Sequence, residues 1–356
     1  MLWKRVSAVL VLRRRKTDLL TEKIRLHKER NVILTAYIQQ TGGEFSPIEK
    51  RPVVLILPGG AYAYCSDQES DPVAFPYLKA GYHVCILRYS VMEHAVWPNP
   101  INDYEMAAEY IKSKEDEWHL YSDKIVVVGF SAGGHLAACA ASMAENRPVA
   151  AILGYAAVAD ETISLLLPSA PDATIAVNEN TCPCFIFAGR NDTTVPVMNS
   201  VKMMEALIKN DISFESHIYA SATHGFGIGN STRGYDANAF CSRVPRWTED
   251  SIEWLRDMVG DFGPKGFDAP RYDRIINGNH NKFYSIDCTV DYIVQNLKTV
   301  EIIEPYLEQV KAMFHIEGEP KSFYNLKVQE LLKLCGVSPE KARELDEVLC
   351  AIENIR

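Results

Sequence analysis

The chain has 356 residues, of which 47% are hydrophobic and 23% charged, and its formal net charge is −9 at pH 7. This composition excludes a disordered chain, which would be poorer in apolar residues, and the length predicts one large domain with a smaller one. The acidic balance argues against nucleic acid as a partner, and no apolar run reaches the roughly 20 residues of a membrane-spanning helix.

The first 30 residues are basic, with ten Lys or Arg against three Asp or Glu. An export signal is one interpretation, because Lys4 and Arg5 precede an apolar run over residues 6–12. That run is minimal and leads straight into four cations at 13–16 rather than into a small-residue cleavage site. A basic leading segment over residues 1–23, exposed to solvent, is therefore the preferred interpretation.

Short Val- and Ile-rich runs alternate with runs of helical period from Ile24 to Asp261. This alternation predicts an α/β fold, residues 24–263, in which helices cover both faces of a mostly parallel sheet. About eight strands are expected, over residues 24–28, 32–38, 53–57, 83–87, 125–128, 151–155, 185–188 and 214–219. Helices are expected to begin near Pro100, Ala132, Pro196 and Pro245. Proline favours the first helical turn, where its missing N–H costs nothing.

After Gly260, a run rich in glycine and proline ends this alternation, so a domain boundary is predicted between Gly263 and Pro264. Apolar residues then recur at helical spacing. We expect residues 264–356 to form a helical accessory region that packs on the first domain or on a second copy of the chain and supplies no catalytic group. The alternative is a lid over a site in the first domain. Its candidate residues are Phe267, Tyr272 and Phe283.

The nine cysteines are scattered without the spacing of a disulfide framework, which favours free thiols in a reducing cytoplasm. Cys182-Pro183-Cys184 could suggest a metal clip, but no second cysteine pair or histidine cluster completes a set of four ligands. We therefore expect a cytoplasmic protein without a bound metal.

Gly129-Phe130-Ser131-Ala132-Gly133 has the pattern G-x-S-x-G. A buried-strand run precedes it directly and a helix rich in small residues follows it, which is the setting of a nucleophilic serine. Side chains two residues either way would collide with neighbouring backbone, so both flanks need glycine. Ser131 is the candidate nucleophile, and the N–H of Ala132, at a helix N-terminus, is a candidate oxyanion donor.

A serine hydroxyl needs a base within hydrogen-bond reach to remove its proton. His224 follows the predicted strand 214–219 by a short loop, which puts it at the carboxyl edge of the sheet with Ser131. His135, in the helix after Ser131, and His83, in a strand, are interpreted as structural. His224 is therefore the candidate base.

The acid that orients this base is expected at the end of another strand. Asp192 lies on the turn after strand 185–188, at the same edge of the sheet. There it would hold one tautomer of His224 and stabilise the imidazolium. Asp160 and Asp172 are rivals, but neither directly follows a strand that faces His224.

Further oxyanion donors are expected in the loop after the buried run of residues 53–57. Pro58-Gly59-Gly60-Ala61-Tyr62 follows this run, and its glycines let backbone N–H groups turn inward. Gly60 and Ala61 are the candidate donors.

Taken together, residues 24–260 resemble the α/β-hydrolase esterases, in particular the carbohydrate acetyl esterases and feruloyl-esterase-like enzymes near the hormone-sensitive-lipase group. The segments that carry this resemblance are P-G-G-A-Y at 58–62, G-F-S-A-G-G-H-L-A at 129–137, G-R-N-D-T-T-V-P at 189–196 and H-G-F-G at 224–227. The family order of Ser, Asp and His agrees with 131, 192 and 224. Pro58 and Ala61 depart from the family's H-G-G-G motif, at its histidine and its last glycine. These departures leave the donors in place and the size of the acyl pocket open.

These residues predict a serine carboxylic-ester hydrolase that works through an acyl-enzyme and needs no cofactor. The resemblance, and a segment from Ala156 to Thr181 too small for a bulky lipase lid, imply a small-molecule ester with a short acyl group, such as an acetylated sugar. A serine peptidase of the same fold is the alternative among enzymes, although no propeller-like repeats are present. A non-catalytic binding protein on a hydrolase scaffold is the alternative outside enzymes, and the oligomeric state, a homo-oligomer included, stays open.

Overall fold

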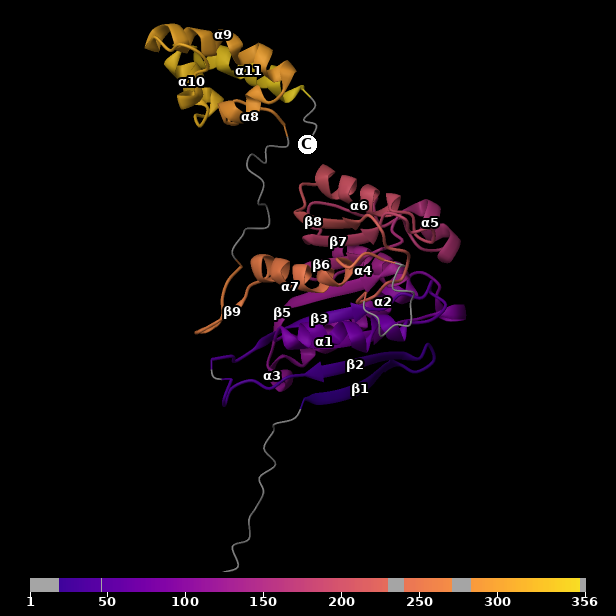
Figure 1. Cartoon of the computed structure of the whole chain (residues 1–356). Helices are drawn as coiled ribbons and strands as arrows, with labels where there is room; N and C mark the ends of the chain where they lie inside the picture. The colour runs from indigo at the N-terminus through magenta and orange to yellow at the C-terminus, as the bar shows by residue number, and fades with distance from the viewer. Residues whose placement is uncertain (1–18, 46, 230–239, 271–282, 353–356) are drawn as a thin grey trace, which may run out of the picture. The chain divides into compact units, whose positions relative to one another are not determined.

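The computed structural model describes residues 19–45, 47–229, 240–270 and 283–352 (Figure 1). The chain forms two compact units that divide between Arg274 and Ile275. Most of the predicted basic leading segment, residues 1–18, and the lid candidate Tyr272 lie outside the described residues.

An eight-stranded sheet organises the larger unit (Figure 1). Its strands are β1 (Leu20–His27), β2 (Val32–Ile38), β3 (Arg51–Leu57), β4 (His83–Arg88), β5 (Leu120–Phe130), β6 (Ala150–Gly154), β7 (Cys184–Gly189) and β8 (Phe214–Tyr219). They lie in the order β1-β2-β4-β3-β5-β6-β7-β8. The pairs β1–β2 and β2–β4 are antiparallel and all other pairs are parallel. The predicted α/β fold with a mostly parallel sheet is confirmed.

The sheet is buried on both faces because its central strand β3 is apolar at every position from Val53 to Leu57. All seven residues of β3 are buried. Since successive side chains of a strand point to opposite faces, Val53, Leu55 and Leu57 enter one core while Val54 and Ile56 enter the other. Each such side chain contributes about 1.5–3 kcal/mol when it is fully removed from water.

Helices supply the other wall of each core. On one face lie α1 (Asp71–Lys79) and α7 (Trp247–Met258), and on the other lie α2 (Asn99–Ser113), α4 (Ser131–Met143) and α6 (Met198–Lys209). Shorter elements are η1 (Asp67–Glu69), η2 (Met92–His94), α3 (Glu115–Trp118), α5 (Asp160–Leu166) and η4 (Val244–Arg246). The helix starts expected near Pro100, Ala132, Pro196 and Pro245 all lie within two residues of the observed ones, and a 3-10 turn at Pro245 leads into α7.

The strand order of the sheet reverses next to β3. From β3 the chain crosses to β4 on one side and then returns to β5 on the other side. Where a parallel sheet reverses its order in this way, the connecting chains diverge and leave room at the carboxyl ends of the strands. Leu57 of β3 pairs with Gly129 of β5, so the loop 58–62 and Ser131 leave the sheet next to each other at this point.

A small hairpin, β9 (Phe262–Gly263) and β10 (Gly266–Phe267), belongs to the larger unit. The Phe262 ring lies 6.2 Å from that of Tyr82, and the Phe267 ring lies 5.6 Å from that of Tyr121. The boundary predicted between Gly263 and Pro264 falls inside this hairpin, ahead of the division at Arg274. Breaker residues mark a tight turn as readily as a linker, and sequence alone does not separate the two.

The smaller unit is helical, as expected. It contains α8 (Val290–Val294), α9 (Leu297–Phe314), η5 (Lys321–Phe323), α10 (Val328–Leu334) and α11 (Pro339–Cys350) around an apolar core of its own. The Ser338 hydroxyl accepts the N–H of Lys341 and caps α11. Within the described ranges, no helix is both long and apolar enough to cross a membrane. All nine cysteines are free.

Candidate active site

Ser131 occupies a sharp bend between β5 and α4. Its φ of +51° is a left-handed conformation that side-chain-bearing residues seldom adopt. A Cβ at Gly129 would lie 2.2 Å from the carbonyl oxygen of Gly133, and a Cβ at Gly133 would lie 2.1 Å from that of Leu57. The bend therefore fits only with glycine on both sides, for the steric reason that the sequence suggested.

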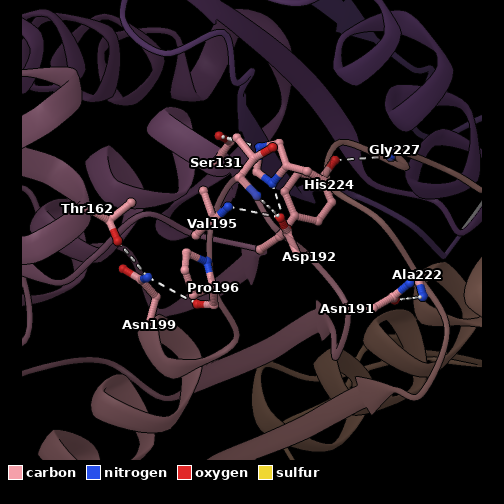
Figure 2. A network of polar contacts seen from close by, with 12 residues as sticks. Ser131, Thr162, Asn191, Asp192, Val195, Pro196, Asn199, Ala222, His224 and Gly227 are labelled. Carbon is pink, nitrogen blue, oxygen red and sulfur yellow. Dashed lines mark hydrogen bonds and ion pairs between the residues drawn. The ribbon is translucent and has the colours of Figure 1, made fainter.

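Ser131, His224 and Asp192 form a hydrogen-bonded chain (Figure 2). His224 Nδ1 lies 2.7 Å from Asp192 Oδ2, and His224 Nε2 lies 2.9 Å from Ser131 Oγ. A carboxylate only accepts hydrogen bonds, so Nδ1 carries the ring proton and Nε2 is free to accept the serine proton. The three residues come from the ends of three different strands, β5, β7 and β8.

Asp192 is held rigidly in this chain. Its Oδ1 accepts the backbone N–H groups of Thr194 and Val195, both at 2.9 Å, while Oδ2 faces His224. The carboxylate is fully buried. Because each carboxylate oxygen already accepts its own hydrogen bonds, the carboxylate cannot rotate freely and it fixes the ring orientation and tautomer of His224.

A hydrogen bond and a close backbone approach join the Asp192 loop to the His224 loop, and the sequence analysis missed both. Asn191 Oδ1 accepts the N–H of Ala222 at 2.7 Å, which ties the Asp192 loop to the His224 loop (Figure 2). At Gly189 a Cβ would lie 1.8 Å from the carbonyl oxygen of Ala222, so only glycine lets the two loops approach. Gly189 directly before Arg-Asn-Asp is the one local signal that could have indicated this approach.

The loop after β3 has three consecutive residues with positive φ. Gly60, Ala61 and Tyr62 have φ values of +130°, +55° and +58°. No acceptor for the N–H of Gly60 or of Ala61 lies among the residues that the structure describes. The N–H of Ala132, in the first turn of α4, has no intrahelical acceptor by helix geometry. The N–H groups of Gly60 and Ala61 and that of Ala132 are thus left without an acceptor among the described residues.

The rival histidines have structural tasks. His135 is fully buried, with Nδ1 2.8 Å from the Tyr62 hydroxyl and Nε2 2.8 Å from the Pro171 carbonyl oxygen, so the ring donates to Pro171 and accepts from Tyr62. His83 is buried likewise between Gln39 and Trp118. Burial lowers the pKa of each to about 4, so both rings are neutral near pH 7.

The rival carboxylates do not reach His224 through any contact of the described residues. Asp172 accepts the N–H groups of Asp160 and Thr174, which makes it a turn residue. No group of three or more His, Cys, Asp or Glu side chains within the described ranges could hold a metal ion.

Known families match the larger unit in two stretches. Residues 46–156 match the BD-FAE family, and residues 167–243 match the prolyl oligopeptidase family. The first stretch contains Ser131 and the loop 58–62, and the second contains Asp192 and His224.

One solved structure is matched by this chain over nearly the whole length of the solved protein. The crystal structure of an α/β-hydrolase enzyme from a Medee basin deep-sea metagenome library is 38% identical in sequence, with a TM-score of 0.64, and the match covers 68% of this chain and 98% of that one. The unit of that enzyme and the larger unit here therefore share one fold.

Curated relatives share part of their length with this chain. The acetylxylan esterase of Xylanibacter ruminicola is 26% identical over 223 residues, which is 55% of this chain and 46% of that protein. Endo-1,4-beta-xylanase B of Butyrivibrio fibrisolvens is 28% identical over 211 residues, which is 51% of this chain and 33% of that protein. The chain thus spans between a third and a half of the length of these relatives.

Proposed function

The chain belongs to the α/β-hydrolase family, and on that premise we propose that it is a serine carboxylic-ester hydrolase that works through an acyl-enzyme intermediate. The observation that carries the proposal is the chain of hydrogen bonds from Ser131 through His224 to Asp192, at 2.9 and 2.7 Å. At the Ser131 end of this chain, the neighbouring backbone N–H groups of Gly60 and Ala61 have no acceptor among the described residues. A nucleophile, a base, an acid and an oxyanion hole are the parts that acyl transfer requires.

In the proposed reaction His224 Nε2 takes the proton of Ser131 as Oγ attacks the ester carbonyl. The carbonyl oxygen becomes an oxyanion that accepts hydrogen bonds from the N–H groups of Gly60, Ala61 and Ala132. The imidazolium is stabilised by Asp192 and returns its proton to the leaving alcohol. Water then attacks the acyl-enzyme by the same steps, and the acid and free Ser131 are released. No cofactor enters either half of the reaction.

The proposed substrate is a short-chain acyl ester, with an acetylated carbohydrate as the leading candidate. The likeness to an acetylxylan esterase supports an acetyl group. So does the segment between Ala156 and Thr181, in which α5 is a single helix of 7 residues. The xylanase shares only a third of its length, so its name does not say which activity that third carries. A cytoplasmic location, which the nine free cysteines support, and a possible homo-oligomer complete the proposal.

A serine peptidase is the second candidate, because the stretch that holds Asp192 and His224 matches the prolyl oligopeptidase family. Peptidases and esterases of this fold share the same reacting groups, and only the leaving group separates them. The two candidates therefore differ in whether an aminoacyl amide or an acetyl ester is the better substrate.

Labelling by a fluorophosphonate probe tests whether the site is catalytic. We expect the wild-type protein to be labelled and the Ser131→Ala variant to remain unlabelled. Ester hydrolysis by this variant should be a few per cent of the wild-type rate or less. Ser113→Ala, an exposed serine on α2, is the matched control and should label normally. An unlabelled wild-type protein would support a non-catalytic binding role.

A substrate panel then separates esterase from peptidase. It consists of p-nitrophenyl esters from acetyl to dodecanoyl, acetylated sugars, and aminoacyl amides. The proposal expects kcat/KM to be highest for acetyl esters and to fall with acyl length. A kcat/KM higher on the amides than on any ester would favour the peptidase.

A further inference from the structure

A carboxylate outside the proposed catalytic groups is buried beside the oxyanion loop. Glu69, on η1, is 4% exposed. Its Oε2 accepts the N–H of Gly59 at 2.8 Å, and its Oε1 accepts the hydroxyl of Tyr155 at 2.6 Å. A buried carboxylate is costly unless hydrogen bonds satisfy it, so these contacts hold the group in one place.

Tyr155 extends this contact to the loop of the base. Its hydroxyl oxygen accepts the N–H of Gly227 at 3.0 Å, the contact that ends on Gly227 in Figure 2. Its ring forms an edge-to-face contact with the imidazole of His224, with ring centres 5.0 Å apart. Tyr155 has a φ of +34°, a conformation that costs a side-chain-bearing residue energy and persists only where its surroundings enforce it. The fold thus holds a strained tyrosine against the base.

The same carboxylate lies close to the nucleophile. A Cβ at Gly59 would be 2.7 Å from Glu69 Oε2 and 3.0 Å from the Cβ of Ser131. Gly59 therefore fills the narrow space between Glu69 and Ser131. The next two residues along the chain are Gly60 and Ala61, so any shift of Gly59 is passed to both candidate oxyanion donors.

We propose that Glu69 is a positioning residue that holds the oxyanion loop (residues 58–62) and the His224 loop in fixed positions relative to each other. The inference rests on the proposed function, because it concerns the same site. The bridge runs from Gly59 through Glu69 and Tyr155 to Gly227, and each hydrogen bond along it has a fixed direction. Gly227 donates to the Tyr155 oxygen, Tyr155 donates its proton to Glu69, and Gly59 donates to the other carboxylate oxygen. Both carboxylate oxygens accept.

Glutamine is the informative replacement because it keeps the shape of Glu69 but offers only one accepting oxygen. If its amide NH₂ faces the Gly59 N–H, two donors meet and that hydrogen bond is lost; if it faces Tyr155, the hydroxyl must turn its proton away and accept from the amide as well as from Gly227. In either orientation the bridge loses its charged acceptor and is weakened. Oxyanion donors act mainly after the tetrahedral oxyanion forms, so displacing them lowers kcat with little change in KM. Removing one such donor outright costs roughly 10²–10³ in kcat, so a displaced loop should cost about 10- to 100-fold.

The experiment compares Glu69→Gln and Tyr155→Phe with Asp67→Asn. Asp67 lies on the same 3-10 turn with a side chain that is 87% exposed and paired to Arg88, which makes it the matched control. Rates on p-nitrophenyl acetate are expressed per fluorophosphonate-titrated site, so that loss of folded protein does not lower kcat. The affinity of an alkylboronic acid, whose serine adduct places an oxygen in the oxyanion hole, is measured alongside.

We expect kcat to fall about 10- to 100-fold in Glu69→Gln and by a similar factor in Tyr155→Phe. Boronate affinity should weaken in parallel, KM should stay within about threefold, and Asp67→Asn should match the wild-type protein. Unchanged kcat per titrated site and unchanged boronate affinity in both variants would overturn the positioning role. If Glu69→Gln does not fold, Tyr155→Phe decides alone, because it keeps the ring packing and removes only the bridging hydroxyl. A wild-type protein that is not labelled would instead refute the proposed function.

Discussion

The two oxygens of the Asp192 carboxylate have different tasks, since Oδ1 accepts two backbone N–H groups and Oδ2 accepts the imidazole. Asp192→Asn keeps the volume of this side chain but must turn its NH₂ either toward backbone donors or toward His224 Nδ1. In the second orientation the ring presents the wrong tautomer to Ser131. We expect kcat to fall by about 10³–10⁴ with the fold intact.

The measurement is kcat on p-nitrophenyl acetate together with the thermal unfolding midpoint. Asp160→Asn, at the rival carboxylate, is the control and should retain wild-type activity. A loss of less than about tenfold in Asp192→Asn would mean that another group orients His224.

Local pattern explains which site residues the sequence could predict. Ser131 lies in a five-residue motif between a strand and a helix, and Asp192 and His224 each follow a strand by a short loop. The Glu69–Tyr155 contact joins residues 86 positions apart, and neither lies in a recognisable motif. Such a pair is brought together by the crossing of β3, β5 and β6, which sequence spacing does not encode.

At the scale of elements, the strands were easier to predict than the helices. β8 has its expected bounds, but β5 begins five residues before its predicted apolar run, because polar residues such as Ser122 and Asp123 extend it. Helix α1, which contains Pro72 and Pro76, was not among the predicted helices. Pro72 fits the first turn, whereas Pro76 removes one internal hydrogen bond whose loss the burial of Val73 and Tyr77 offsets.

Two buried histidines that link elements predict how stability depends on pH. His83 joins β4 to the chain at Gln39 and Trp118, and His135 joins α4 to Tyr62 and Pro171. Burial lowers both pKa values to about 4, from 6.5 in an exposed ring. Between pH 6.5 and 4 the unfolded chain therefore binds more protons than the folded one. As the pH is lowered through this window, the free energy of unfolding should therefore decrease by about 1.4 kcal/mol per pH unit for each ring.

Denaturant unfolding followed by tryptophan fluorescence measures this slope. All five tryptophans precede Arg274, so the signal reports on the larger unit alone. His83→Gln should remove about half of the slope that the two rings contribute. Unfolding free energy that stays flat from pH 6.5 to 4.5 would contradict the assignment.

For the whole molecule, the open question is what the smaller unit contributes. Phe267, one of the three lid candidates, packs on Tyr121 at the start of β5, whereas Ser131 follows its end. A strand rises about 3.3 Å per residue, so these two positions are roughly 30 Å apart and Phe267 cannot cover Ser131. Phe283 belongs to the smaller unit and is the remaining described candidate.

A chain that ends at Pro270 tests whether the smaller unit docks or acts as a lid. The solved α/β-hydrolase enzyme is matched over 98% of its length by 68% of this chain, so a unit of this kind folds without such an appendage. The smaller unit keeps apolar side chains exposed, with Leu297, Phe314 and Val348 each more than half exposed, and burying one of them is worth about 1.5–3 kcal/mol. We therefore expect the shortened protein to retain kcat on p-nitrophenyl acetate within about tenfold while losing stability or changing its oligomeric state.

Light scattering measures the oligomeric state and denaturant unfolding measures the stability. In the full chain, Phe283→Ala should leave kcat unchanged. A stable shortened protein with a collapsed kcat, accompanied by a loss of kcat in Phe283→Ala, would replace docking with a lid.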